Sequence, residues 1–308
     1  MSKTNADSPL VDSASWRDYL ELCKPGVVAL MILTSVIGML LATPGMVPLD
    51  ILLIGNLGIA LCAGSAAAVN HLVDRQVDQK MARTFNRPVA KGRVDPTHAA
   101  LFALVIGALG ITLLIVFVNT VTAWLTLLSL LGYAVVYTLF LKRATPQNIV
   151  IGGLAGAAPP LLGWTAVTGE IQGHGLLLVL IIFAWTPPHF WALAVHRKDE
   201  YANAEIPMLP VTHGERYTKI HIFLYTVILF IVSLLPFVTG MMNWLYLLGA
   251  VVLGLGFLYW ASVLLLSDKR ETGMLTFKYS IVYLMALFMI MLLDHYLLPI
   301  TQPFTLGQ

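Results

Sequence analysis

The stretch NHLVDRQVDQKMARTFNRPVAKGR, residues 70 to 93, places many polar side chains between two long apolar segments. Within it, Asn70, Asp74 and Asp78 recur every four residues. On a helix each is rotated by only about 40° from the one before and rises by roughly 6 Å, so the three side chains share one face. The stretch therefore predicts a helix that carries amide and carboxylate oxygens to the place where the membrane meets water.

The oxygens of this face predict a metal-bridged diphosphate. Stacked carboxylates repel one another unless a cation lies between them. Hard oxygen ligands suit Mg²⁺, which takes one or two protein carboxylates and completes its shell with water and substrate phosphate. Arg83, Arg87 and Lys91 also recur at intervals of four and suit phosphate oxygens. The alternative is that the cations are topology signals, paired with the aspartates in a solvated loop.

Composition indicates a polytopic, all-α membrane protein. Hydrophobic residues make up 58% of the chain and charged residues 11%, and the mean hydropathy is +0.82, which excludes a soluble globular domain. About twenty apolar residues span a bilayer. We expect about nine transmembrane helices, at residues 27–43, 50–69, 98–118, 121–141, 148–168, 175–195, 219–239, 243–266 and 276–298.

The distribution of basic residues predicts the orientation. With these nine segments, all 18 Lys and Arg residues fall on one side of the membrane. By the positive-inside rule that side is cytoplasmic, with the amino terminus and residues 70–93, and the carboxyl terminus lies outside. We expect a cytoplasmic amino-terminal segment at 1–26, a transmembrane domain at 27–298 and a short outer tail at 299–308.

Other features of composition narrow the class. A net charge of +2 does not indicate nucleic-acid binding. Cys23 and Cys62 predict neither a disulfide framework nor a zinc site. Residues 1–26 hold four acidic residues and no apolar core, unlike a signal or transit peptide. A bacterial inner membrane is the simplest location.

Polar side chains near the end of the expected span at residues 121–141 point to the same cytoplasmic side. Tyr133 and Tyr137 share a helix face, and Lys142 follows just over one turn later. This pattern is typical of a functional site. The alternative is an interfacial aromatic belt with a snorkelling lysine, which has the same pattern. The next span is rich in small residues from Gly152 to Pro160, which predicts a helix that lines a cavity.

His189 follows two prolines inside an apolar span, where a polar side chain is costly and usually functional. The alternative is a histidine bonded to a neighbouring carbonyl. A second polar cluster then follows, with Arg197, Asp199 and Glu200. It echoes the first acidic helix end four spans later, which suggests two related halves that hold metal ions and a diphosphate between them.

The motif Asn70-x3-Asp74-x3-Asp78, with Arg83-Thr84 and Arg87-Pro88 after it, resembles the first signature of the UbiA-type intramembrane prenyltransferases. Four further stretches are similar to the heme O synthases, a branch of that superfamily. They are Tyr137 to Arg143, Gly152 to Trp164, Pro187 to Trp191, and Tyr201 to Val211. The resemblance covers roughly residues 20 to 215.

The resemblance implies a UbiA-type bundle around a central cavity. It implies transfer of a farnesyl group from farnesyl diphosphate to a vinyl group of heme B, with water addition and diphosphate release. It also implies Mg²⁺ at the catalytic residues Asn70, Asp74 and Asp78, with Asp199 and Glu200 as further ligands. By the same resemblance His189 binds heme, and the diphosphate is held by Arg83, Arg87, Lys91, Tyr137, Lys142 and Arg197. Whether a downstream heme-modifying or oxidase-assembly protein receives the product is left open.

One departure concerns the second motif, which in the superfamily is a run of aspartates at four-residue spacing. Here His196, Glu200 and Ala204 occupy one such register, and Asp199 with Asn203 another. In the heme branch an acidic residue stands just before the tyrosine, which favours Glu200 as the metal ligand of this second motif. Two rival functions are a prenyltransferase with a quinone or chlorophyll precursor as acceptor, and a secondary transporter. Transporters place charged sites at the bilayer midplane, whereas both acidic clusters here lie at helix ends.

Overall fold

The computed structural model describes residues 14–80 and 84–298, and every regular element in those ranges is a helix. Eight of the helical stretches are individually long and apolar enough to cross a membrane, and a ninth forms if two short helices joined by a 54° bend are one span. The all-α, polytopic fold predicted from the sequence is therefore confirmed, with eight or nine spans among the described residues.

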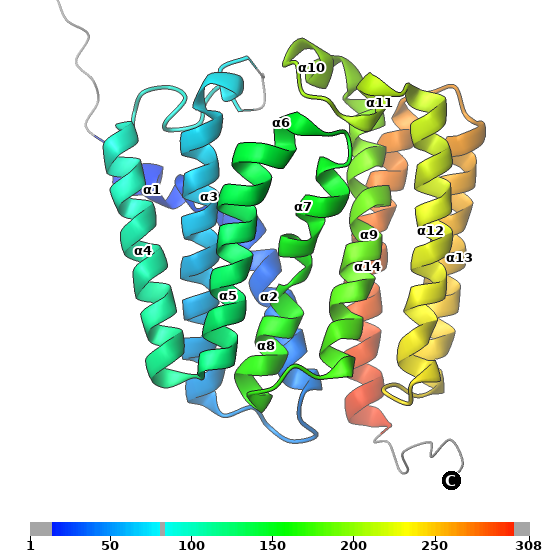
Figure 1. The fold of residues 1–308 in the computed structure, drawn as a ribbon. Coiled ribbons are helices and arrows are strands. Elements are labelled where there is room, and N and C mark those ends of the chain that lie inside the picture. Colours follow the sequence, from blue (N-terminus) through cyan, green and yellow to red (C-terminus); the bar gives the residue numbers. More distant parts are fainter. Residues whose placement is uncertain (1–13, 81–83, 299–308) are drawn as a thin grey trace, which may run out of the picture.

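The helices stand side by side as one bundle (Figure 1). The amino-terminal half contains α1 (Trp16–Leu22), α2 (Pro25–Leu41), the π-helix η1 (Ile51–Gly55), α3 (Asn56–Asp78), α4 (Pro96–Phe117), α5 (Thr120–Leu131), the π-helix η2 (Gly132–Leu141) and α6 (Lys142–Ala144). The rest contains α7 (Asn148–Ala157), α8 (Pro159–Thr168), α9 (Gly173–His196), α10 (Lys198–Asn203), α11 (Leu209–Thr212), α12 (Glu215–Val238), α13 (Trp244–Leu266) and α14 (Glu271–Leu297).

The second span is longer than its apolar sequence predicts. The apolar segment was expected to end at residue 69, and α3 continues without a break to Asp78, as the four-residue spacing of its polar side chains predicted. Small residues let α3 pack closely on α4, where the hydroxyl of Ser65 donates a hydrogen bond to the carbonyl of Ala103 at 2.7 Å. Hydrophobicity ends at residue 69 because the helix leaves the apolar layer there, whereas its backbone hydrogen bonding continues.

The span at residues 148–168 is divided into α7 and α8, and Pro159 and Pro160 occupy the first positions of α8, where a helix tolerates proline because the N–H groups there have no partner within the helix. The carbonyl of Pro160 lies so close to Gly38 of α2 that a Cβ atom at Gly38 would overlap it. This close approach packs α8 directly on α2, while α7 packs on α9 and η2.

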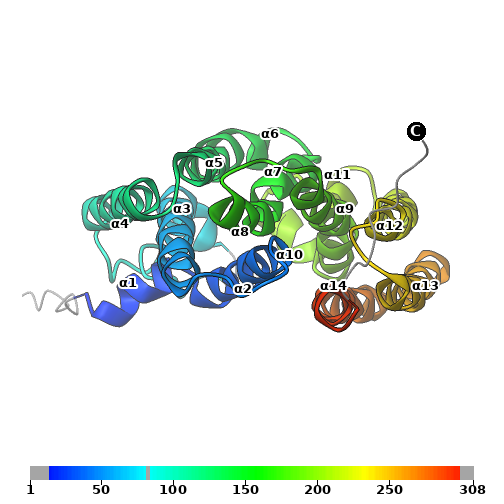
Figure 2. The ribbon, with the colours of Figure 1, turned by 90° about the horizontal axis from the view of Figure 1, so that it is seen from below.

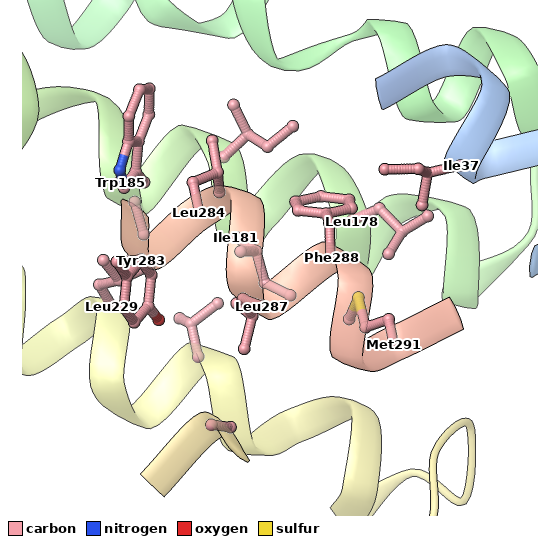
Figure 3. Close-up of a cluster of buried hydrophobic side chains, with 14 of the residues drawn as sticks. Ile37, Leu178, Ile181, Trp185, Leu229, Tyr283, Leu284, Leu287, Phe288 and Met291 are labelled. Carbon is pink, nitrogen blue, oxygen red and sulfur yellow. The ribbon is translucent and has the colours of Figure 1, made fainter. Parts of the chain in front are cut away.

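The main apolar core lies between α9, α12 and α14 (Figure 3). The side chains of Ile181, Leu229, Tyr283, Leu287 and Phe288 are each at most 2% exposed. Each fully buried side chain of this size stabilises the fold by about 1.5–3 kcal/mol relative to an exposed one, an upper estimate where the reference environment is lipid. This core fixes α14 against α9.

The two ends of the bundle differ in charge. Basic residues lie in α6 and in the connections between α3 and α4, α9 and α12, and α13 and α14, all of which are at the upper end in Figure 1, together with α1. The view from below shows α1, α3 and α4 on one side, α9 and α12 to α14 on the other, and α2 and α8 between them (Figure 2). The expected outer tail at 299–308 and residues 1–13 of the amino-terminal segment lie outside the described residues.

Candidate active site

The polar face of α3 is buried in the bundle. Asn70, Asp74 and Asp78 are 3%, 0% and 3% exposed. The side-chain amide of Asn70 donates a hydrogen bond of 2.7 Å to Oδ2 of Asp74, so side chains on consecutive turns touch. The three oxygen-bearing side chains thus lie on one face, as the four-residue spacing predicts.

Three cations from three other segments neutralise this face. The Nζ atom of Lys24 lies 2.6 Å from Oδ1 of Asn70, and Nζ of Lys142 lies 2.5 Å from Oδ2 of Asp74. One Nη atom of Arg87 donates to both carboxylate oxygens of Asp78 at 2.8 Å. Buried carboxylates need such partners, because leaving a charge unpaired away from water is costly. The result is one compact site in which each of the three α3 side chains contacts a cationic side chain.

Lys24 is a member of this site that the sequence analysis missed. It was counted only as a topology signal, yet it lies at the bend between α1 and α2 and has a left-handed backbone, with φ 50° and ψ 63°. This conformation is rare for a residue with a Cβ atom and is found at functional sites. The position before Pro25 and Gly26, at the end of a short helix, was the available signal.

A cavity of about 470 Å³ opens beside the polar face. Its wall comes from α2, α3, α5, η2, α7, α8, α9 and one residue of α14, and most of the lining is apolar. Lys24, Tyr133 and Tyr137 are among its polar lining residues, and Trp185 and His189 of α9 line it as well. The central cavity that the resemblance implied is therefore present.

The tyrosines of this wall lie on the π-helix η2. Tyr133 and Tyr137 stack with ring centroids 5.3 Å apart, and the hydroxyl of Thr138 donates to the carbonyl of Tyr133 at 2.8 Å. π-Helical turns occur frequently at functional sites. A Cβ atom at Gly152 of α7 would overlap the ring of Tyr137, so glycine there lets the ring lie against the helix.

His189 is 6% exposed and is held between two aromatic rings. Its centroid lies 4.0 Å from that of Trp185 and 4.4 Å from that of Phe277. Its Nδ1 atom lies 2.6 Å from the hydroxyl of Ser280 in α14. Among the described residues, the hydrogen-bond partner of His189 is thus a hydroxyl from another helix rather than a neighbouring carbonyl, and the ring also lines the cavity.

The second acidic cluster is arranged differently from the first. The side chains of Asp199 and Glu200 are 76% and 44% exposed. Asp199 lies 2.7 Å from Arg270, and Glu200 lies 3.9 Å from Arg197. Across the described residues, no three His, Cys, Asp or Glu side chains converge in a way that suits a metal ion. The metal-binding roles of Asp199 and Glu200 therefore remain predictions.

The other predicted phosphate ligands also differ in their surroundings. Lys91 is exposed, and its Nζ atom lies 3.4 Å from Oδ1 of Asn86. Arg197 pairs with Glu200 rather than with the α3 face. Arg83 lies outside the described residues. Among the described residues predicted to bind diphosphate, the structure brings Arg87 and Lys142 to the carboxylates.

Comparisons with known proteins identify the family of this chain. Residues 31–292 match the model of the UbiA prenyltransferase family. The chain belongs to this family. Two relatives with the name protoheme IX farnesyltransferase are similar over nearly their full length. One, from Saccharophagus degradans, is 76% identical and covers 94% of this chain and 95% of its own. The other, from Teredinibacter turnerae, is 70% identical and covers 96% and 95%.

Solved structures of other UbiA family members share the fold. A structure reported as digeranylgeranylglyceryl phosphate synthase has a TM-score of 0.79 at 18% identity, and covers 92% of this chain and 99% of its own. A UbiA homolog from Archaeoglobus fulgidus, solved with GPP and Mg²⁺ bound, has a TM-score of 0.58 at 16% identity and covers 89% and 99%. At these identities the likeness concerns the fold alone.

The oxygen face of this UbiA family member has the donors that Mg²⁺ prefers. It offers an amide oxygen and two carboxylates on successive turns, all at most 3% exposed. Each of these residues contacts a Lys or Arg side chain. The residues present therefore fit a hard divalent cation. Such a cation would take the place of the Arg87 and Lys142 side chains at the carboxylates, and these side chains could then bind a phosphate.

Proposed function

We propose that this chain transfers a farnesyl group from farnesyl diphosphate to the vinyl group of heme B, forming heme O with addition of water and release of diphosphate. The observation that carries this proposal is the 76% identity, over nearly the full length of both chains, to a relative named protoheme IX farnesyltransferase. The buried α3 face and the cavity beside it supply the two parts that such a reaction needs.

The diphosphate end of the reaction lies at the α3 face. Mg²⁺ bound by Asn70, Asp74 and Asp78 would neutralise the charge that develops on the leaving diphosphate. Arg87 and Lys142 are already at this face, and each would exchange a carboxylate for a phosphate oxygen. The predictions for Arg83, Lys91, Tyr137 and Arg197 as further diphosphate ligands, and for Asp199 and Glu200 as further metal ligands, stay part of the proposal.

The bond changes follow from the chemistry of an allylic diphosphate. The C–O bond of farnesyl diphosphate breaks and its electron pair leaves with the diphosphate. The π electrons of the vinyl group then form the new C–C bond, and water adds to the resulting cation and loses a proton to solvent. The mainly apolar wall of the cavity limits premature capture of the first cation by water.

His189 would bind heme on the other wall of the cavity. Its ring is fixed by Trp185 and Phe277, and histidine is a common ligand of heme iron. The relatives' names favour heme over the quinone and chlorophyll precursors, and the family favours a prenyltransferase over a transporter.

We further infer that the α3 face lies at the cytoplasmic side of a bacterial inner membrane, with the amino terminus inside and the carboxyl terminus outside. The support is that the basic residues of the described connections gather at this end of the bundle. Handover of the product to a downstream heme-modifying or oxidase-assembly protein is an open part of the same proposal.

The experiment is mass analysis of the hemes formed when the purified protein in detergent receives heme B, farnesyl diphosphate and Mg²⁺, with EDTA as the control. We expect a product heavier than heme B by one farnesyl group and one hydroxyl group, because the added water loses a proton, and we expect it to form only with the metal. If the folded protein yields no such product and instead prenylates an aromatic acid, the acceptor is that aromatic compound and not heme B.

A further inference from the structure

The hydroxyl of Ser280 lies between two potential partners. Its Oγ atom is 2.6 Å from Nδ1 of His189 and 2.6 Å from the carbonyl oxygen of Phe277. All three residues lie near the point where α9 packs on α14, and Ser280 is 0% exposed. Because Ser280 has one hydroxyl proton, that proton can serve only one of the two contacts.

Counting protons decides which contact it serves. A carbonyl oxygen only accepts hydrogen bonds, so the contact between Ser280 and Phe277 needs the serine proton. If that proton pointed to His189, two oxygens would face each other at 2.6 Å with no proton between them, which is repulsive. Ser280 therefore donates to the carbonyl of Phe277 and accepts from Nδ1 of His189.

We propose that Ser280 is a positioning residue, which holds His189 as the tautomer with its proton on Nδ1 and leaves the lone pair of Nε2 free for a ligand in the cavity. Among the described residues, Nε2 has no hydrogen-bond partner, and the imidazole lines the cavity. A neutral imidazole with a free Nε2 is the form that binds iron. That Nε2 binds heme iron rests on the proposed function, whereas the assignment of the tautomer rests on the hydrogen-bond geometry alone.

The surrounding contacts keep the ring in place for this role. Trp185 and Phe277 stack on the two sides of His189, with interplanar angles of 21° and 28°. The indole N–H of Trp185 donates to the backbone carbonyl of Ser280 at 2.8 Å. Ser280 thus contacts two side chains of α9, His189 through its hydroxyl and Trp185 through its backbone carbonyl. The sequence analysis found no chemistry in α14, since a serine in an apolar helix carries no distinctive pattern.

The first test measures the tautomer itself, in the wild-type protein without heme. Histidine labelled with ¹⁵N in the full-length protein in detergent gives separate signals for protonated and bare ring nitrogens. The His189 signals among the eight histidines are identified by their loss in His189→Ala. We expect Nδ1 protonated and Nε2 bare. A proton on Nε2 would overturn the proposal, whatever the protein does with heme.

The second test measures heme affinity by absorbance titration with heme B. Ser280→Ala removes the acceptor for Nδ1 and should weaken binding by about 10- to 100-fold, as loss of an outer-shell partner of a metal-binding histidine does. Ser280→Thr keeps a hydroxyl and should restore most of the affinity. Unchanged affinity in Ser280→Ala would overturn the proposal.

Ser233 is a matched control for this titration. It is also 0% exposed in an apolar helix, and its hydroxyl donates to the carbonyl of Phe230, three residues back, at 2.7 Å. It does not line the cavity. Ser233→Ala should therefore bind heme like the wild type. If Ser280→Ala does not fold, the ¹⁵N measurement on the wild type decides alone. If the wild type binds no heme, the role of His189 in the proposed function fails while the tautomer is still tested.

Discussion

The Nζ atom of Lys142 lies 2.5 Å from Oδ2 of Asp74, and this contact joins residues that are 68 positions apart in the chain. Asp74 is fully buried and also accepts a hydrogen bond from Asn70. The same carboxylate therefore connects the oxygen face of α3 to a cation at the end of η2. Substitution of Asp74 and substitution of Lys142 should therefore affect different kinetic parameters.

Asp74→Asn should lower turnover by at least about 100-fold, because it removes a negative ligand from the metal that supports departure of the diphosphate. Asparagine has nearly the same shape, so the protein should still elute as a folded species from a sizing column and keep its heme affinity. The rate is measured as heme product per enzyme. Normal turnover in this variant would contradict the assignment of Asp74 to the metal.

Lys142→Gln should raise the KM for farnesyl diphosphate by about tenfold or more, since a hydrogen bond to a charged group contributes about 1.5–3 kcal/mol. Initial rates at saturating heme B give this value. Lys80→Gln is the control, because Lys80 is a partly exposed lysine at the same end of the bundle and pairs with Glu205 at 3.7 Å. Equal KM values in both variants would mean that Lys142 does not contact the diphosphate.

Gly152→Ala should destabilise the protein by about 1–3 kcal/mol and reduce activity, because its new methyl group would overlap the ring of Tyr137 and displace it. Gly156→Ala, on the same helix, has nothing within 4 Å of its new Cβ and should be neutral or slightly stabilising. Thermal unfolding in detergent compares the two. Because Gly156 also lines the cavity, the comparison concerns stability alone, and a Gly152→Ala protein as stable as Gly156→Ala would disprove the close packing of Tyr137 on α7.

Glu200→Gln should raise the Mg²⁺ concentration that gives half-maximal rate by about tenfold or more, if Glu200 becomes a metal ligand when substrate binds. Glu205→Gln is matched to it in charge and location, and the Glu205 side chain is 83% exposed and paired with Lys80. Magnesium titrations of the two variants should therefore separate. If the curves coincide with that of the wild type, the second acidic cluster does not hold the metal.

Much of this protein follows from local patterns in the sequence. Apolar run length predicted the spans, and the four-residue spacing predicted that Asn70, Asp74 and Asp78 share a face. Helical periodicity is a property of a single segment, so it can be derived without knowing the neighbours of that segment. Hydropathy alone would end α3 at residue 69, whereas the spacing of its polar residues predicted that the helix continues through Asp78, as the structure shows.

The tertiary structure alone decided which side chains meet. Lys24 reaches Asn70 across 46 positions, and His189 reaches Ser280 across 91. Arg197 was predicted as a diphosphate ligand by family resemblance, and the fold shows its neighbour, Glu200, at 3.9 Å. Such pairings depend on how helices pack, which is set by close approaches such as that of Gly38 to Pro160 and by the core between α9 and α14. The sequence by itself determined the membrane fold, the oxygen face and the family resemblance, while packing between distant helices determined the charge pairs and the orientation of His189.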